Sequence, residues 1–268
     1  MELNKIYNVD CVEGLKQVSD NSVDLIVTSP PYNVGIEYDS WNDNMKWEDY
    51  LAWCEKWLTE CYRVLKPDGR ICINHYFCFA PRKNGDTCSR FPLFDLKNIM
   101  DKLGYNTHKI VMWDDPTMKK LTAWGSWKSA SAPFIQTPYE GILIAYKEQW
   151  ERIEKGESTI SKNDFMEACS GVWHMGTTQS YTLANFPEKL PQLCVDLLTY
   201  TGDLVLDPFS GSGTTCYVAK SLGRQFLGFE ISEAYWRESI SRLNGMPYKV
   251  LSNDNPYNAK KLNKKKLI

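Results

Sequence analysis

The pattern of apolar and polar residues divides the chain into two blocks that repeat the same kinds of element. In the first block, residues 5–75, the pattern predicts strands in KIYNVD, SVDLIVTS and GRICINHYF and a short helix in CVEGLKQV. In the second block, residues 187–245, it predicts helices in PEKLPQLCVDLLTYTG, TTCYVAKSLG and SEAYWRESISRL, with strands DLVLDPF and QFLGFEI between them. Such repeated units predict an α/β fold, a parallel sheet with helices on both faces.

A long amphipathic helix is predicted inside the first block. Apolar side chains recur there at spacings of three and four residues, which places them on one helix face, and the turn KPDG follows. These side chains are Trp47, Tyr50, Leu51, Cys54, Trp57, Leu58, Cys61, Val64 and Leu65. We interpret this face as part of the core. The middle of the chain, 76–186, is more irregular, with FPLFDLKNIMDKLGY, THKIVMW and YEGILIAYK as a continuation of the helix and strand pattern.

Composition and charge limit the possible folds and partners but do not identify a function. A chain of 268 residues is long enough for one large α/β domain with insertions, or for two small domains. A net charge of -2 gives no global basic signal, so a nucleic-acid partner would have to bind a local patch. No apolar run approaches the roughly 18 residues that a membrane span needs.

The cysteines indicate a reducing compartment. There are nine of them, an odd number with no CxxC pair, and no signal peptide precedes them, so we expect reduced thiols and a cytoplasmic protein. The nearest approach to a metal cluster is formed by Cys72, His75, Cys78 and Cys88. Their spacing fits no known zinc pattern, and we therefore expect no metal site.

A rigid corner, TSPPYN at residues 28–33, follows the strand SVDLIVTS. Proline fixes φ and lacks a backbone N–H, so Pro30 and Pro31 form a stiff turn whose carbonyls cannot join a sheet ladder. The carbonyls are therefore available to something outside the sheet.

A glycine loop, DPFSGSGTT at residues 207–215, lies between a predicted strand and a predicted helix. Gly211 and Gly213 permit a tight turn, and the helix N-terminus after them offers unpaired N–H groups to a ligand with carboxylate or hydroxyl groups. The loop is neither a dinucleotide fingerprint, because Cys216 stands where the third glycine would be, nor a phosphate-binding loop. Glu230 ends the next strand, where an acidic side chain can accept both hydroxyls of a ribose or support the cap of the following helix.

Together the two motifs resemble those of amino-methyltransferases that act on DNA and use S-adenosylmethionine. The order of the motifs, Ser29-Pro30-Pro31-Tyr32 before Phe209-Ser210-Gly211-Ser212-Gly213, is that of the β group of these enzymes. The likeness covers most of the chain, through YNVDCVEGL, RVLKPDGR, PYEGILIAYK and the segment from Asn185 to Phe209. It implies a circularly permuted, Rossmann-like class I methyltransferase sheet with a small target-recognition insertion.

The resemblance also implies a division of the chain. Residues 1–146 and 187–248 would form the catalytic domain, with the target-base half in 1–75 and the cofactor half in 187–248. The target-recognition region would be 147–186. A basic tail, 249–268, ends the chain, and either a solvated terminus or a phosphate contact fits its composition.

For catalysis, the resemblance implies that the first side chain of the motif and a proline carbonyl accept hydrogen bonds from the target amine. The lone pair of an exocyclic amine is delocalised into the base, and two acceptors would localise it and aim it at the methyl group. In this chain the acceptors would be Ser29 Oγ and the Pro30 carbonyl, held by Pro31, and Tyr32 would stack on a base that has left the helix. Tyr32 covering the strand end, and His75 as a satisfied core histidine, are the structural alternatives.

For the cofactor, the resemblance implies a set of residues around the glycine loop. Phe209 would pack near the sulfonium, Asp207 and the loop would line the methionine end, and Phe186 would close one side. Thr214 and Thr215 would cap the next helix, and Asp10 would either contact the adenine amine or cap its own helix. The full set is Asp10, Phe186, Asp207, Phe209, Gly211, Ser212, Gly213, Thr214 and Glu230.

For DNA, the stretch KKLTAWGSWKSASAPF combines positive charge with flat aromatic surface, which suits a loop that follows the phosphate backbone and stacks on bases. A hydrophobic lid is the alternative. Trp41 would lie on a loop that can close over the flipped base. The predicted DNA-binding residues are Trp41, Lys119, Lys120, Trp124, Trp127 and Lys128. The resemblance allows a homodimer and a cognate restriction endonuclease, and the short recognition region suggests a short site in duplex DNA.

The sequence leaves alternatives open for the target base and for the class of reaction. In this group SPPY is more often associated with cytosine and DPPY with adenine, so Ser29 favours cytosine-N4 over adenine-N6, although either side chain can accept the hydrogen bond. Methylation of ring carbon five of cytosine would need a thiolate beside a proline, and no Pro-Cys dipeptide occurs. RNA and protein-amide methyltransferases place the cofactor loop before the PPY motif, and a non-catalytic DNA-binding protein would not need both motifs.

Overall fold

An eight-stranded sheet runs through the computed structural model, which describes residues 1–79, 89–115, 125–133, 135, 137, 139–176 and 186–245. From one edge to the other the strands are β1 (Lys5–Asn8), β8 (Gln225–Glu230), β7 (Leu204–Asp207), β2 (Val23–Thr28), β3 (Leu65–Tyr76), β5 (Tyr139–Tyr146), β4 (Asn106–Asp114) and β6 (Val172–His174). All neighbours are parallel except the two pairs that β5 makes with β3 and β4. The strands predicted in both blocks are therefore present in one sheet.

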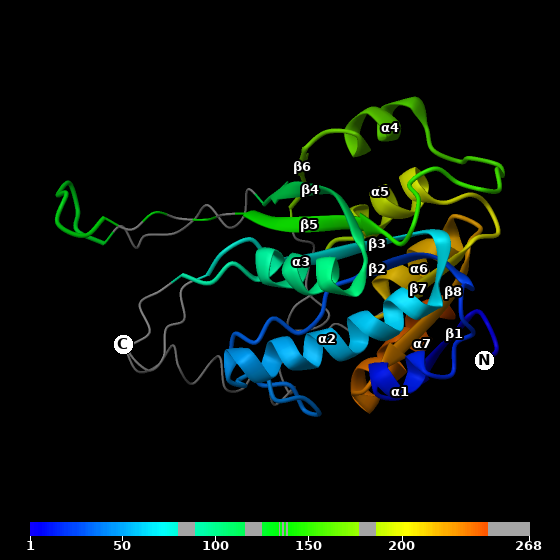
Figure 1. The fold of residues 1–268 in the computed structure, drawn as a ribbon, viewed down its shortest axis with the longest axis horizontal. Helices are drawn as coiled ribbons and strands as arrows, with labels where there is room; N and C mark the ends of the chain where they lie inside the picture. Colours follow the sequence, from blue (N-terminus) through cyan, green and yellow to red (C-terminus); the bar gives the residue numbers. More distant parts are fainter. Residues whose placement is uncertain are drawn as a thin grey trace.

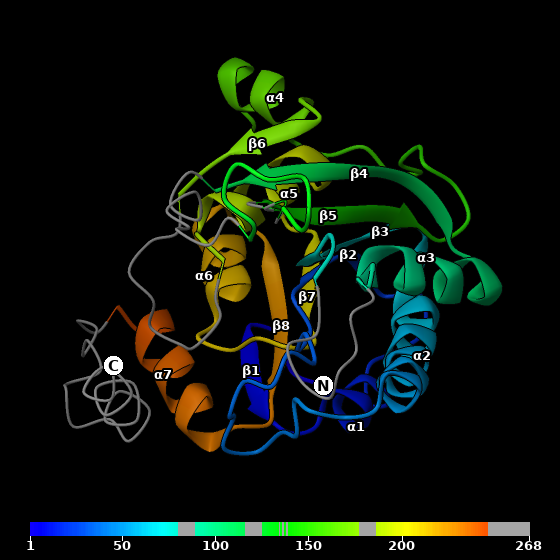
Figure 2. The same ribbon diagram turned by 90° about the vertical axis from the view of Figure 1, so that its left-hand side faces the viewer.

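Helices cover both faces of the sheet, as predicted (Figures 1 and 2). One face carries α1 (Cys11–Leu15), α2 (Trp47–Val64) and α3 (Pro92–Leu103), and the other carries α5 (Lys189–Leu198), α6 (Thr214–Ser221) and α7 (Glu233–Leu243). Each layer encloses its own apolar cluster against the sheet. The predicted face of α2 is confirmed as core, since Tyr50, Cys54, Trp57, Leu58 and Cys61 are fully buried.

The KPDG turn lies inside a strand pair and not ahead of the strand. Val23 pairs with Leu65, but Leu25 pairs with Arg70, so residues 66–69 bulge out between β2 and β3. The backbone of β3 is extended on both sides of this bulge, so one strand continues through it. The bulge is tied to the chain after β5, because Lys147 N donates to Gly69 O (3.1 Å) and Glu148 N to Pro67 O (2.9 Å).

The two blocks meet between β2 and β7, where Leu25 pairs with Val205 and Ile26 with Leu206. From β2 the chain passes through α2 to β3 on one side, and from β7 it passes through α6 to β8 on the other side. The two connections therefore leave in opposite directions. This opens a crevice at the carboxyl ends of β2 and β7. In open α/β sheets this switch point is where ligands bind.

The region 147–186 contains two elements that the pattern did not predict. Helix α4 (Lys162–Ala168) lies beyond the sheet edge, and β6 adds to β4 in parallel, with Met112 opposite Val172 (Figure 1). Trp173 anchors β6, because its indole is buried and its Nε1 donates to Ala168 O at 3.3 Å. The tail 249–268 lies outside the described residues. Among the helices of the described residues, none is long and apolar enough to span a membrane.

Candidate active site

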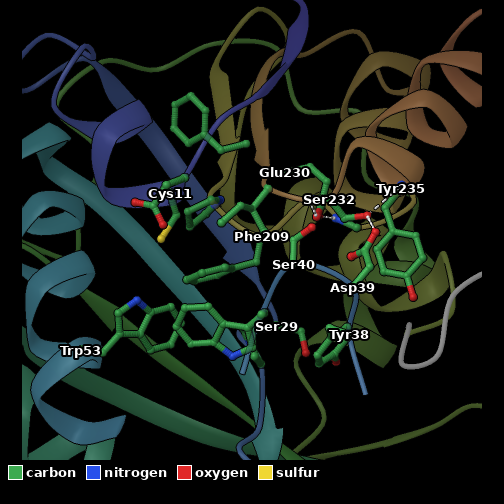
Figure 3. A pocket seen from close by; sticks show the side chains of 17 residues that line it. Cys11, Ser29, Tyr38, Asp39, Ser40, Trp53, Phe209, Glu230, Ser232 and Tyr235 are labelled. Carbon is green, nitrogen blue, oxygen red and sulfur yellow. Dashed lines mark hydrogen bonds between the residues drawn. The ribbon is translucent and has the colours of Figure 1, made fainter. Parts of the chain in front are cut away.

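A pocket opens where the carboxyl ends of β1, β8, β7 and β2 meet (Figure 3). It encloses about 730 Å³ of space, part of which is open to solvent. Ser29 and Pro31 line it from the first block, and Phe209, Gly211 and Glu230 line it from the second. The other lining residues are Asp10, Cys11, Tyr38, Asp39, Ser40, Trp41, Trp53, Pro208, Phe229, Ile231, Ser232 and Tyr235. The proline corner and the glycine loop thus face the same cavity.

A buried hydrogen bond joins the two halves at their strand ends. Thr28, the last residue of β2, donates through Oγ1 to Asp207 Oδ1 at 2.7 Å. The same carboxylate oxygen accepts from Phe209 N at 3.0 Å, which fixes the start of the glycine loop. Burial raises the pKa of Asp207 to about 6. Asp207 lies behind the pocket wall, where it sets the position of the residues that line the pocket.

The two carbonyls of the proline corner differ in their hydrogen bonds among the described residues. Tyr50 Oη on α2 donates to the Pro31 carbonyl at 2.8 Å, which ties the corner to the helix. No hydrogen bond within the described part of the chain reaches the Pro30 carbonyl. Pro30, whose carbonyl the resemblance implies as an acceptor, is buried next to the pocket and is not one of its lining residues.

Tyr32 is buried behind the corner, with 9% of its surface exposed. Its ring stacks on His75 at a centroid distance of 4.1 Å and meets Tyr76 edge-on at 4.8 Å. His75 therefore covers one face of the Tyr32 ring. Burial lowers the pKa of His75 to about 3, so the ring is neutral. His75 is a core residue, as expected, although its Nδ1 has no partner among the described residues.

The glycine loop bends through two left-handed residues, Gly211 (φ 51°) and Gly213 (φ 77°). A Cβ on Gly213 would lie 2.9 Å from Ser239 Cβ, so the position requires glycine on both grounds. Gly211 N donates to Glu230 Oε2 at 2.7 Å, and Ser232 N donates to Oε1 at 2.8 Å. Burial raises the pKa of Glu230 to about 7. The Glu230 carboxylate therefore lies in the pocket wall and also holds the turn before α7.

The prediction that Thr214 and Thr215 cap α6 is wrong. The N-cap is Gly213, whose left-handed backbone starts the helix without a side-chain hydrogen bond. Thr214 Oγ1 accepts from Arg242 Nη1 on α7 at 2.9 Å, and Thr215 Oγ1 donates to Val27 O at 3.3 Å. Ser212, Gly213 and Thr214 do not line the pocket. They support the loop, while Gly211 is the loop glycine that lines it.

Two other predicted cofactor residues have different placements. Asp10 combines both of its alternatives, since it lines the pocket and caps α1 by accepting from Val12 N at 2.9 Å and Glu13 N at 3.3 Å. Both cap bonds use Oδ1, and no hydrogen bond among the described residues uses Oδ2. Phe186 does not close a side of this pocket as expected, because it comes just before α5 and packs into the core on that face of the sheet.

An aromatic wall faces the glycine loop, and the sequence analysis missed part of it. Phe209 lies 5.5 Å from Trp53 and 5.2 Å from Trp57, measured between ring centroids, and Trp53 lies 4.4 Å from Trp41. Trp53 was missed because it lies next to, and not on, the regular apolar face of α2. Trp41, predicted to contact DNA, lies in this wall.

The loop after the corner, residues 33–46, was predicted only through Trp41, and its other pocket-lining residues were missed. Asp43 organises it by accepting hydrogen bonds from Asn33 N (2.7 Å), Val34 N (3.0 Å) and Ile36 N (3.0 Å). Asp39 Oδ2 accepts from Ser232 Oγ at 2.8 Å, which connects the loop to the cofactor half (Figure 3). The signal in the sequence was the cluster of turn residues in DSWNDN, whose side chains bond to nearby backbone.

The predicted DNA-binding stretch is described only in part. Lys119, Lys120 and Trp124 lie outside the described residues. Trp127 and Lys128 form the tip of a small hairpin, closed by a bridge between Gly125 and Pro133, and Trp127 is 67% exposed. Figure 1 shows this hairpin, in green, projecting beyond the end of the sheet. Within the residues that the structure describes, no group of His, Cys, Asp and Glu could hold a metal ion.

Comparisons with known proteins identify the family of the chain. The sequence model of the DNA methylase family, covering N6 and N4 methyltransferases, matches residues 23–241. The type II methyltransferase M.MjaVI of Methanocaldococcus jannaschii is 38% identical over 179 residues, which are 63% of this chain and 88% of the relative. The type II methyltransferase M.BglII, from Bacillus subtilis, is 33% identical over 91% of this chain and 70% of its own length.

Solved structures confirm the predicted fold class. A putative DNA modification methylase from Thermus thermophilus, solved with S-adenosyl-L-methionine, superposes with a TM-score of 0.72 at 28% identity, over 90% of this chain and 93% of its own. The cytosine-N4-specific PvuII DNA methyltransferase superposes with a TM-score of 0.70 at 21% identity, over 97% and 89% of the two chains. The chain therefore belongs to the DNA methylase family and is a DNA methyltransferase of the class that methylates an amino group, the N4 of cytosine or the N6 of adenine.

Proposed function

We propose that the pocket transfers a methyl group from S-adenosylmethionine to the exocyclic amine of a base flipped out of duplex DNA, with cytosine-N4 as the favoured target. The observation that carries this proposal is the shared cavity, in which Ser29 and Pro31 face Gly211 and Glu230. A base amine and a cofactor can meet only if their two half-sites open into one space.

The cofactor half fits S-adenosylmethionine by its donor and acceptor groups. S-adenosylmethionine supplies a methyl group on a positively charged sulfur. The Glu230 carboxylate, at the end of β8, can accept two hydroxyl hydrogens, and the free Oδ2 of Asp10 can accept from an adenine amine. Phe209 and the tryptophans beside it offer ring faces that favour a cation.

The target half provides the acceptors for the amine hydrogens. Ser29 Oγ and the Pro30 carbonyl are the two atoms proposed to accept the amine hydrogens. The hydrogen bond from Tyr50 to Pro31 and the rigid prolines hold the two acceptor atoms in place before the base binds. The entropy of ordering these atoms is therefore lost during folding and not during base binding.

Ser29 is the reason for favouring cytosine-N4, and adenine-N6 is the alternative. The alternative rests on chemistry, because a serine hydroxyl can accept a hydrogen bond from either amine. The order of the motifs disfavours RNA and protein-amide methyltransferases, which carry the cofactor loop first.

For DNA binding, we propose that the 125–133 hairpin presents Trp127 and Lys128 to the duplex. A homodimer and a companion restriction endonuclease are also proposed, since the relatives above are type II methyltransferases. An enzyme that modifies cellular DNA would work in the cytoplasm of a bacterium or archaeon.

Transfer of a labelled methyl group from the cofactor tests the proposal. The protein is incubated with duplex DNA, single-stranded DNA and RNA, and the product is digested to nucleosides for mass spectrometry. The expected product is N4-methylcytosine in duplex DNA. N6-methyladenine would establish the alternative base, and label in RNA alone or in no nucleic acid would overturn the proposal.

A further inference from the structure

A buried carboxylate lies behind the proline corner, outside the pocket lining. Glu140 on β5 is 8% exposed and belongs to neither of the two motifs. Its Oε2 accepts from Tyr32 Oη at 2.8 Å and from Asn74 Nδ2 at 2.7 Å. Tyr32 Oη in turn lies 3.0 Å from Ser29 Oγ, which lines the pocket. A continuous chain of hydrogen bonds therefore runs from the pocket surface to Glu140.

The direction of this chain follows from what each group can donate. An ionised carboxylate only accepts, so the Tyr32 proton points to Glu140. Asn74 Nδ2 donates to Tyr32 Oη at 2.5 Å as well as to Glu140, and the opposite amide orientation would place its carbonyl against the carboxylate. Tyr32 Oη can then only accept from Ser29. The Ser29 proton points into the protein, and its lone pairs are left for the pocket.

This direction matters because a serine hydroxyl is both donor and acceptor. An amine that must localise its lone pair needs an acceptor, and a hydroxyl proton turned toward the amine would compete for that lone pair. An aspartate in the first position of the motif is acceptor-only and has no such ambiguity. A serine needs its proton held elsewhere.

We propose that Glu140 is a positioning residue that acts through Tyr32 to keep the Ser29 hydroxyl in the accepting orientation. The inference rests on the proposed function and adds a residue that neither motif contains. Glu140 does not line the pocket, and two hydrogen bonds connect it to Ser29.

The surroundings of Glu140 make the arrangement sensitive to pH. The groups that face it are Tyr32, Asn74 and Tyr76, together with Asp115 after β4, whose negative charge adds to the effect of burial. Both effects raise the pKa of Glu140, while the bonds from Tyr32 and Asn74 lower it. Below that pKa a protonated Glu140 can donate to Tyr32, which frees Tyr32 to donate to Ser29. Turnover should therefore fall on the acid side as Glu140 takes up its proton.

The test compares methyl transfer by Glu140→Gln and Tyr32→Phe with that of the wild type. Glutamine has the same shape but can donate to Tyr32, and phenylalanine keeps the ring while removing the link. Each variant should lower kcat by about tenfold to a hundredfold, the range for one hydrogen bond to a charged group, with KM for S-adenosylmethionine unchanged. The double variant should lose no more than the worse single variant, because both break one chain.

Two further arms separate positioning from a structural role. In a Ser29→Asp background, which needs no oriented proton, Glu140→Gln should cost less than about threefold in kcat. Glu140→Gln should also remove the acid limb of the pH profile. Tyr105→Phe is the matched control, since it deletes another buried tyrosine hydroxyl, bonded to Leu58 O at 2.8 Å, and should leave kcat unchanged.

Several outcomes would overturn the inference. These are wild-type kcat in Glu140→Gln, multiplicative losses in the double variant, or an undiminished loss in the Ser29→Asp background. If Glu140→Gln does not fold, as judged by its melting curve, Tyr32→Phe alone and in the Ser29→Asp background carries the same test. A wild-type protein that methylates no nucleic acid would instead refute the proposed function.

Discussion

The two halves of the pocket follow neighbouring parallel strands, yet they are fixed in different ways. The proline corner after β2 is held by side chains, through Tyr50, Tyr32 and the buried network behind them. The glycine loop after β7 is held through its own backbone N–H groups, which donate to the carboxylates of Glu230 and Asp207, and two left-handed glycines shape the turn. Rigid acceptor atoms suit an amine that must be aimed. A loop that offers backbone groups close to the ligand suits a cofactor that must be held.

A buried hydrogen bond from Thr28 to Asp207 joins the halves at their strand ends. This bond couples the position of the corner to that of the loop across the switch point of the sheet. If the division of labour is correct, variants of the corner should alter turnover, variants of the loop should alter cofactor affinity, and variants of the junction should alter both.

The largest effect is expected at Ser29. Ser29→Ala removes the side-chain acceptor for the target amine and should lower kcat by about a hundredfold to a thousandfold, as for other preorganised hydrogen-bonding groups in active sites. The measurement is single-turnover transfer of labelled methyl to duplex DNA. Transfer within threefold of the wild type would show that Ser29 is not the acceptor.

The next largest effect is expected at Glu230. Glu230→Gln replaces an acceptor of charge -1 with a neutral amide and should weaken S-adenosylmethionine binding by about tenfold to a hundredfold, as expected for a hydrogen bond to a charged group. Turnover at saturating cofactor should change much less.

The pH dependence of binding gives Glu230 a second signature. Its pKa of about 7 means that the carboxylate ionises between pH 6 and pH 8, and only the ionised form accepts two hydroxyl hydrogens. Wild-type affinity should therefore rise with pH across this range, and the rise should be absent in Glu230→Gln. Glu238→Gln is the matched control, because burial also raises the pKa of Glu238 to about 7 but Glu238 does not line the pocket.

A smaller effect on both halves is expected at the junction. Thr28→Val keeps the shape but removes the donor to Asp207, which should lower the free energy of unfolding by about 1 to 2 kcal/mol. We expect kcat and cofactor affinity to fall together by several-fold. Thr59→Val, at an exposed position on α2, is the control. A change in only one of the two quantities would argue against a coupling role for this bond.

The smallest effect is expected at the Asp39 contact. Asp39→Ala removes the acceptor of the Ser232 hydroxyl and should weaken cofactor binding by about threefold, in the range of a single, partly exposed hydrogen bond. Titration calorimetry can resolve this change, with Asp49→Ala on the exposed face of α2 as the control. An unchanged affinity would mean that the 33–46 loop does not help to form the cofactor site.

Periodicity was sufficient to predict the helices and strands of both blocks. In α2, for example, side chains spaced for one helix face are the ones that the sheet buries. Periodicity cannot give the neighbours of a strand, and so the antiparallel insertion of β5 between β3 and β4 was not predicted. The short elements α4 and β6 were missed because their stability comes from anchors such as Trp173 and not from a repeating pattern.

The candidate site was predictable where a motif carries its own geometry. Prolines define the corner and glycines define the loop, so their residues could be named before the fold was known. The rest of the pocket depends on contacts between distant segments. Asp39 and Trp53 belong to the first block and Ser232 to the second, and Phe186, which directly precedes the second block, packs away from this pocket.

Titration of S-adenosylmethionine into the Ser29→Ala protein tests the central claim most directly, because it measures the cofactor half after the target half has been disabled. The account predicts a dissociation constant equal to that of the wild type in a protein that no longer transfers methyl groups. A tenfold weaker affinity in Ser29→Ala would show that the corner helps to hold the cofactor, and the proposed division between the two halves would be wrong.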